Sequence, residues 1–132
     1  MFQIDTMSRT PVYEQIIGQL KKFILNGVIV PGQQVPSIRG LSIDLTINPN
    51  TILKAYSELD SKGIIHSVPG KGYFVCPDAL KILKKEHLNK LDELTAMLSN
   101  MALAGVPKED ILKCVSDAYE LKVTRKEQTN DD

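Results

Sequence analysis

A polar run, Asn48-Pro49-Asn50-Thr51, stands directly before a segment with helical spacing of apolar residues. Asn48 is a favourable helix N-cap, and proline is favoured at the first helical position, which Pro49 would take. An asparagine amide carries a donor and an acceptor side by side, as adenine N6 and N7 require, and a threonine can hydrogen-bond to a base or touch a thymine methyl group. We therefore expect Asn48, Pro49, Asn50 and Thr51 to form a helix tip that faces the edges of DNA bases.

Two basic residues near this tip are further candidates for contacts to DNA. Lys54 follows one helical turn later and could bind a phosphate as a point charge. Arg39 comes two residues after Ser37, which we expect to cap a short helix, and its guanidinium could hold a phosphate or a guanine. We predict that Ser37, Arg39 and Lys54 contribute to DNA binding. The alternative is that Asn48 acts only as a cap, that Asn50 and Thr51 are surface polar residues, and that Arg39 is a solvated surface residue.

A third candidate is the run Pro69-Gly70-Lys71-Gly72, which joins two short segments rich in β-branched and aromatic residues. Glycines supply the positive φ angles of a tight hairpin and let the main chain approach a partner closely. Lys71 at such a tip could enter a minor groove or clamp the DNA backbone. Many hairpins carry a similar motif, so the motif alone is a weak signal. We predict DNA contacts for Gly70, Lys71 and Gly72 because the hairpin follows three predicted helices.

The elements that must position these residues follow from the spacing of apolar side chains. Residues 11–26 and 49–62 each show one apolar helical face, and a short helix is expected between them. The segments 64–68 and 73–76 have the composition of two strands of a hairpin. The predicted fold is therefore mostly α with a small β-hairpin wing, a winged helix-turn-helix domain over residues 1–76.

Beyond the hairpin the pattern changes to long helices. Residues 78–104 show one long helical pattern, and a second helix is expected over residues 107–122. We predict a two-helix C-terminal region at residues 77–122, followed by a polar and disordered tail at residues 123–132. Two copies of the chain that pack as a helical bundle would bury the apolar face of these helices.

The apolar residues of this C-terminal region are predicted to form the interface of a homodimer. They are Leu80, Leu91, Leu94, Leu98, Met101, Ile111, Leu112, Val115 and Tyr119. The alternative, packing of the two helices on each other within one chain, would cover part of the same face. A dimer would space two helix tips by about one turn of DNA, roughly 34 Å, and would read a pseudo-palindromic operator. A small-molecule effector could act by changing the angle between the helices.

Residues 11–75 resemble the N-terminal DNA-binding domain of the GntR family of bacterial transcription regulators. The residues that carry the resemblance are Gly27, Pro31, Gly32, Pro36, Ser37, Arg39, Leu41, Asn48, Pro49, Asn50, Thr51, Ala55, Tyr56, Leu59, Gly63, Gly70, Lys71 and Gly72. The resemblance implies that Arg39, the tip at residues 48–51 and the wing at residues 70–72 contact DNA.

The chain differs from many family members in the length of its C-terminal region and at two positions of the domain, Gly40, where many members have an acidic residue, and Leu53. Only about 55 residues follow the wing, too few for the large effector-binding domains of other subfamilies. This short helical region resembles the YtrA subfamily, whose C-terminal helices mediate dimerisation and whose members often control neighbouring ABC-transporter genes. Many family members also have an arginine where this chain has Leu53, which shifts the expected cationic contact to Lys54. The resemblance implies a dimeric repressor of its own operon and of a neighbouring ABC-transporter operon.

The composition favours a cytoplasmic protein without a cofactor. Of the 132 residues, 42% are hydrophobic and 24% are charged, and no segment is long and apolar enough to suggest a membrane span or a signal peptide. Cys76 and Cys114 lie far apart, and we find no set of side chains at metal spacing and no nucleophile with a base. We therefore expect neither a metal site nor an enzyme.

The net charge leaves one competing function open. It is zero overall. The first 76 positions contain seven basic and five acidic residues, and the remaining positions contain nine basic and eleven acidic residues. A charge so close to zero is compatible with a winged-helix protein-protein interaction module whose C-terminal helices dock a partner. Binding to DNA through several phosphates would weaken steeply as salt rises, which distinguishes the two functions.

Overall fold

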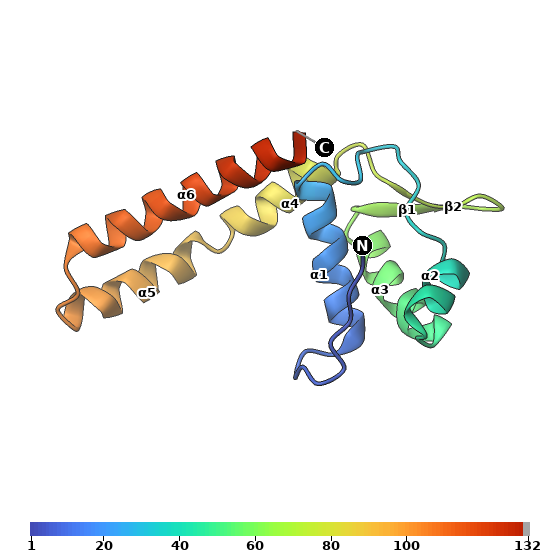
Figure 1. Ribbon diagram of the computed structural model, residues 1–132, viewed down its shortest axis with the longest axis horizontal. Helices are drawn as coiled ribbons and strands as arrows, with labels where there is room; N and C mark the ends of the chain where they lie inside the picture. Colours follow the sequence, from blue (N-terminus) through green and yellow to red (C-terminus); the bar gives the residue numbers. More distant parts are fainter. Residues whose placement is uncertain (131–132) are drawn as a thin grey trace. The chain divides into compact units, whose positions relative to one another are not determined.

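The computed structural model describes residues 1–130, and the side chains of residues 1–121. It divides into two compact units, the first from Met1 to Glu86 and the second from His87 onward. The described part of the chain is mostly helical and contains a two-stranded antiparallel sheet, which confirms the predicted fold class (Figure 1). None of its helices has the length and apolar character needed to span a bilayer.

The first unit contains three helices and then a hairpin, in the predicted order. They are α1 (Val12–Leu25), α2 (Ile38–Leu45), α3 (Pro49–Ser61), β1 (Ile65–Val68) and β2 (Gly72–Val75). The two strands pair antiparallel, with Ile65 opposite Val75 and Val68 opposite Gly72. Three residues therefore remain at the tip, which is the short glycine-containing loop that the sequence predicted.

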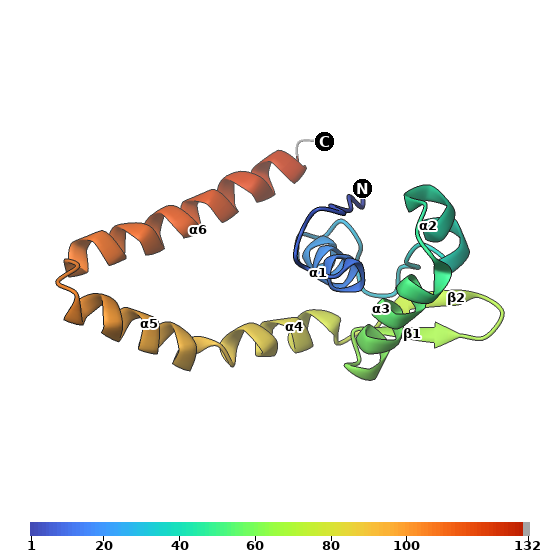
Figure 2. The same ribbon diagram turned by 90° about the horizontal axis from the view of Figure 1, so that it is seen from below.

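The segment before α2 pairs with β2 and ties the hairpin to the helices. Gln34 forms an antiparallel bridge with Phe74. The backbone N–H of Val35 donates to the carbonyl of Tyr73 at 2.9 Å. Since Ser37 follows two residues later, this pairing fixes the start of α2 and the hairpin relative to each other. Figures 1 and 2 show the hairpin tip projecting away from α3.

One hydrophobic core joins the N-terminal segment, the helices and the hairpin of the first unit. Its buried residues are Phe2, Ile16, Ile17, Leu20, Ile24, Ile29, Val35, Leu41, Ile52, Ala55, Tyr56, Leu59, Ile64, Ile65, Val75, Ala79 and Leu83. The hydroxyl of Tyr56 donates to the carbonyl of Pro36 at 2.7 Å, and its ring meets that of Tyr73 edge to face. Burial raises the pKa of Tyr56, so the hydroxyl stays protonated and remains a donor.

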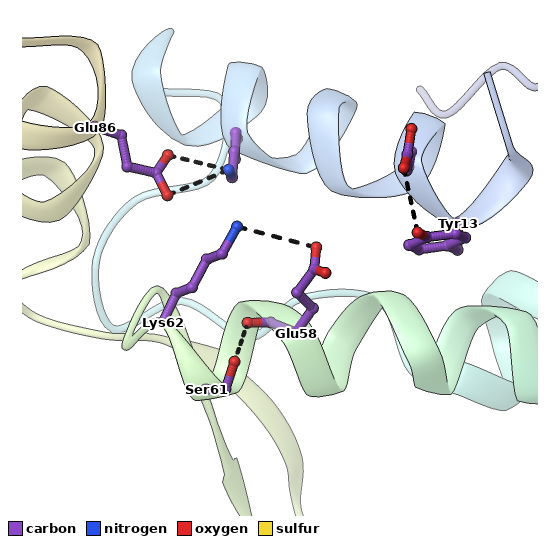
Figure 3. Close-up of polar contacts among 7 residues, drawn as sticks. Tyr13, Glu58, Ser61, Lys62 and Glu86 are labelled. Atoms are coloured by element: carbon purple, nitrogen blue, oxygen red, sulfur yellow. Dashed lines mark hydrogen bonds and ion pairs between the residues drawn. The ribbon is translucent and has the colours of Figure 1, made fainter. Parts of the chain in front are cut away.

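α4 (Ala79–Leu88) begins just after the hairpin and packs on the first unit. Ala79 and Leu83 are fully buried. Lys21 of α1 and Glu86 form an ion pair at 3.0 Å (Figure 3). The compact unit therefore extends to Glu86, whereas we expected the domain to end directly after the hairpin. The buried residues of α4 also fit the apolar periodicity of a long C-terminal helix, so the pattern alone could not assign them to the first unit.

α5 (Leu91–Leu103) is separate from α4. We expected a single helix over residues 78–104, and this expectation was wrong because a turn at Asn89 and Lys90 divides it. The backbone N–H of Lys90 donates to the carbonyl of His87 at 3.0 Å. Asparagine is a weak helix former, but it carries no signal as strong as glycine or proline. Between residues 79 and 130 the structure thus shows three helices where the sequence suggested two.

α6 (Lys108–Asn130) follows a turn at Gly105, whose φ of 85° lies in the left-handed region that glycine adopts readily. Figure 2 shows α5 and α6 diverging from this turn. The helix continues to Asn130, past residue 122, where we expected a disordered tail to begin. Residues 123–130 contain neither glycine nor proline, so nothing in them ends the helix. The last two residues of the expected tail, 131–132, lie outside the described residues.

Candidate nucleic-acid interface

The polar tip is built as a capped helix start. The side-chain Oδ1 of Asn48 accepts a hydrogen bond from the backbone N–H of Asn50 at 2.9 Å, and Pro49 occupies the first helical position. Both predictions are confirmed. The cap hydrogen bond occupies one of the two acceptor positions of the Asn48 Oδ1, and a base contact by Asn48 stays a prediction. Asn50 is exposed, and its side-chain amide takes no part in the cap. Thr51 beside it is half-buried.

The rest of α3 separates into a buried face and an open face. Ile52, Ala55, Tyr56 and Leu59 are fully buried, as their helical spacing predicted. Asn50, Leu53 and Ser57 are exposed and follow one another at spacings of three and four, so they share one side of the helix. This open side begins at the capped tip, the part of a recognition helix that meets bases.

Lys54 is exposed on α3 and contacts a side chain of α1. Its Nζ sits over the ring of Tyr13 at 3.9 Å from the centroid, a cation–π contact with α1. The hydroxyl of Tyr13 in turn donates to Glu14 Oε1 at 3.2 Å, and this hydrogen bond raises the pKa of Tyr13 (Figure 3). A phosphate contact by Lys54 stays a prediction, and it would have to compete with this ring.

The start of α2 presents the second group of predicted residues. The Oγ of Ser37 accepts a hydrogen bond from the backbone N–H of Gly40 at 2.9 Å, which confirms it as the N-cap. Arg39 is exposed, and among the described residues no carboxylate forms an ion pair with it. Its guanidinium is therefore available for an anion or a base. The DNA contacts of Ser37 and Arg39 stay predictions.

The hairpin tip is held by a residue that the sequence did not single out. Gly70 and Gly72 have φ angles of 77° and 116°, as a tight turn requires. The side-chain Nε2 of Gln34 donates to the carbonyl of Lys71 at 2.8 Å. A Cβ on Gly72 would lie 2.9 Å from the same Nε2, so the glycine leaves room for the Gln34 side chain. We call the hydrogen bond from Gln34 to the carbonyl of Lys71 the brace of the hairpin. Lys71 is exposed at the tip, and its contact with DNA stays a prediction.

The described residues show no geometry for catalysis or metal binding. They contain no group of three or more side chains that could hold a metal ion. The Nδ1 of His66 lies 3.4 Å from the Sγ of Cys76. Burial, assisted by Asp60 and Asp78, raises the pKa of Cys76, which disfavours the thiolate that a nucleophile or a metal ligand would need.

The predicted dimerisation residues have little cover within the chain. Leu98, Met101 and Ile111 are half-buried, and the others are exposed, namely Leu80, Leu91, Leu94, Leu112, Val115 and Tyr119. Leu80 belongs to α4, whereas the remaining residues lie on α5 and α6. α5 contains no buried residue at all. Near the turn of the second unit lies an apolar cavity of about 350 Å³, lined by Leu98, Ala102, Val106, Lys108, Ile111 and Leu112.

Comparison with known proteins identifies the same region. Residues 12–75 match the family described as bacterial regulatory proteins of the gntR family. The chain is 37% identical over 118 residues to the HTH-type transcriptional repressor YtrA of Bacillus subtilis (strain 168), and the match covers 89% of this chain and 91% of YtrA. This relative is a transcriptional regulator, in agreement with the expectation that the chain is not an enzyme.

Solved structures agree in fold. A GntR family transcriptional regulator from Listeria monocytogenes is 32% identical, with a TM-score of 0.69, and the match covers 86% of this chain and 98% of that one. The DNA-binding domain of AraR in complex with operator ORX1 is 33% identical, with a TM-score of 0.51, over 58% of this chain and 93% of that one. The capped tip, the open side of α3 and the braced hairpin are thus parts of a DNA-binding domain, and the chain belongs to the GntR family of bacterial regulatory proteins.

Proposed function

We propose that this protein is a cytoplasmic, homodimeric repressor that binds a pseudo-palindromic operator in its own promoter region. The observation that carries the proposal is the exposed Asn50 directly behind a capped helix start. Its amide is free to pair with adenine in the major groove. Arg39 and Lys71 would bind phosphates or bases on either side of α3 and so position the helix.

The proposed dimer follows from the apolar side chains of α5 and α6. Leu94 is 48% exposed and Leu112 is 53% exposed, and similar residues recur along both helices. Exposed apolar residues that recur in this way mark an interaction surface, unlike scattered single ones. A second copy offers the same faces and would bury them in a helical bundle. Two linked domains would also bind DNA far more tightly than one.

The sign of regulation and the target genes are proposed by analogy. The relative from Bacillus subtilis carries the name of a repressor. The resemblance to the YtrA subfamily suggests, besides the protein's own operon, a neighbouring ABC-transporter operon as a target. No cofactor is needed for this activity. A small-molecule effector would release the DNA by changing the angle between the C-terminal helices, and constitutive operator binding under every inducing condition would contradict this part of the proposal.

The proposal is tested by a gel-shift titration on the protein's own promoter region at increasing salt. We expect specific binding that weakens steeply with salt, because phosphate contacts release counterions. The double variant Asn50→Ala, Thr51→Ala should lose the preference for this DNA over unrelated DNA. Asn26→Ala, which alters an exposed asparagine at the end of α1, is the matched control and should bind as the wild type does. Unchanged specificity in the double variant would show that the tip does not read bases.

A second candidate function is a winged-helix module for protein contact. The net charge of zero and the exposed apolar side chains of α5 and α6 are the observations that favour it. In that case the wild type would show no preference for any promoter fragment and only a weak salt dependence. Sedimentation equilibrium on the free protein is the companion measurement, since a homodimer in the absence of any other protein supports the first function.

A further inference from the structure

Leu53 is an unusual residue for the open side of α3. It is 43% exposed although it is a large apolar residue, and it lies one turn after Asn50. Ser57 follows four residues later on the same side. The four core residues of the helix face the opposite way, so the exposure of Leu53 is not a result of loose packing. Leu53 therefore stands beside the residue that is placed to read bases.

The contacts of the neighbouring residues show which side of α3 is free. Lys54 lies over the ring of Tyr13, so its flank of the helix faces α1. On the other side, Tyr56 reaches the carbonyl of Pro36, just before α2. Leu53 lies between Asn50 and this second flank, on the side away from α1. The open side of α3 thus carries the apolar side chain of Leu53. The charged end of Lys54 lies over the Tyr13 ring and does not cover Leu53.

We propose that Leu53 contacts the C5-methyl group of a thymine in the major groove and makes the protein select a T·A pair at that position of each half-site. This inference rests on the proposed operator binding. Among the base edges of the major groove, the thymine methyl is the apolar group, and aliphatic side chains bind it by direct contact. Leucine has no donor or acceptor, so it gains nothing from the other base edges and leaves their polar groups without a partner.

The same geometry predicts what a cytosine would do at that position. Cytosine presents its N4 donor and lacks the methyl group, so Leu53 would cover a polar atom and lose an apolar contact. Asn50, one turn earlier, would read the adjacent step through its amide. The two residues together would give each half-site one position chosen by hydrogen bonds and a neighbouring position chosen by shape and apolar contact.

The test uses the full-length wild type and DNA selected by it from a randomised duplex library. Each thymine of the selected duplex is replaced in turn by deoxyuridine, which differs only in lacking the methyl group, and affinity is measured by fluorescence anisotropy. We expect one position per half-site at which the replacement weakens the wild type about fourfold, the factor expected for one buried methyl-sized group. Leu53→Ala should bind the thymine and uracil duplexes equally at that position.

Ile43→Ala is the matched control. Ile43 is an exposed apolar residue of α2, at 67% exposure, and its removal should leave the sensitivity to uracil unchanged. Thermal unfolding of both variants checks that they remain folded. A uracil effect that persists in Leu53→Ala, or a wild type that binds its site without any uracil effect, would overturn the inference while the proposed operator binding stands. Failure of the wild type to enrich any sequence would overturn both.

Discussion

The two compact units of this chain place similar helices in very different surroundings. α1 and α3, of 14 and 13 residues, each bury four residues in the core of the first unit. α5 also has 13 residues and an apolar face, yet it contains no buried residue. Amphipathic periodicity predicts that one apolar face of a helix is buried. It does not predict whether the residues that bury it belong to the same chain. The first unit is completed by its own core, whereas the apolar side chains of α5 are left without burial.

This difference assigns separate tasks to the two regions. The closed core of the first unit holds the tip of α3 and the hairpin in fixed positions, as a surface that must match DNA requires. The open apolar faces of α5 and α6 would determine how two such surfaces are spaced. Changes in the core should therefore affect stability at every protein concentration, whereas changes in the C-terminal helices should depend on concentration.

The largest effect is expected for Leu59→Ala in the core of the first unit. Leu59 is fully buried, and removal of its side chain leaves a cavity, which should lower the free energy of unfolding by about 2–5 kcal/mol. Chemical denaturation at two protein concentrations measures it, and the loss should be the same at both. Leu94→Ala is the counterpart, and its effect should change with concentration. Equal behaviour of the two variants would remove the distinction between the regions.

The next effect concerns Leu98→Glu in α5. Leu98 is half-buried and lines the apolar cavity of the second unit. A charge there should prevent two copies from packing, because an uncompensated carboxylate is costly in an apolar interface. We expect a monomer by sedimentation and about a hundredfold weaker operator binding, through loss of linked binding. Near-ultraviolet circular dichroism should still show a folded first unit.

Leu103→Glu provides the control for this variant. Leu103 is 84% exposed at the end of α5 and does not line the cavity. The same charge at this position should leave the dimer and the operator affinity close to those of the wild type. A Leu98→Glu variant that sediments as a dimer would show that the apolar faces of α5 and α6 do not hold two copies together.

Periodicity and caps predicted most of the first unit because each of its helices faces one core. The N-caps at Ser37 and Asn48 and the glycines of the hairpin tip were found because their signals are local. The division between α4 and α5 was missed, since Asn89 and Lys90 do not interrupt the apolar pattern. The extension of the first compact unit to Glu86 was not predicted, because Ala79 and Leu83 fit a free helix and a core equally well.

Contacts between distant residues explain what the sequence could not predict in the candidate site. The position of Lys54 depends on Tyr13, in another helix. Gln34 and Lys71 are 37 positions apart, and no motif links them. The exposure of Leu53 could be suspected from its helical position, but its free surroundings follow only from the contacts of its neighbours. Local signals thus indicated the candidate interface, and long-range contacts determined which of its side chains already have partners within the chain.

The smallest effect is expected for Gln34→Ala, which tests whether the hairpin tip is part of the rigid first unit. The variant loses the hydrogen bond to the carbonyl of Lys71, worth about 1 kcal/mol in placing the tip. Operator binding should weaken roughly fivefold, and the free energy of unfolding should fall by no more than about 1 kcal/mol, since Gln34 is exposed.

A double-mutant cycle with Lys71→Ala decides how Gln34 acts. If Gln34 serves only to position Lys71, removal of the lysine side chain makes the brace irrelevant, and the double variant should bind no more weakly than Lys71→Ala alone. Additive losses would mean that Gln34 contacts DNA itself. Lack of any loss in Gln34→Ala would mean that the pairing of Gln34 and Val35 with β2 already fixes the tip, so that the backbone alone makes the hairpin as rigid as the helices.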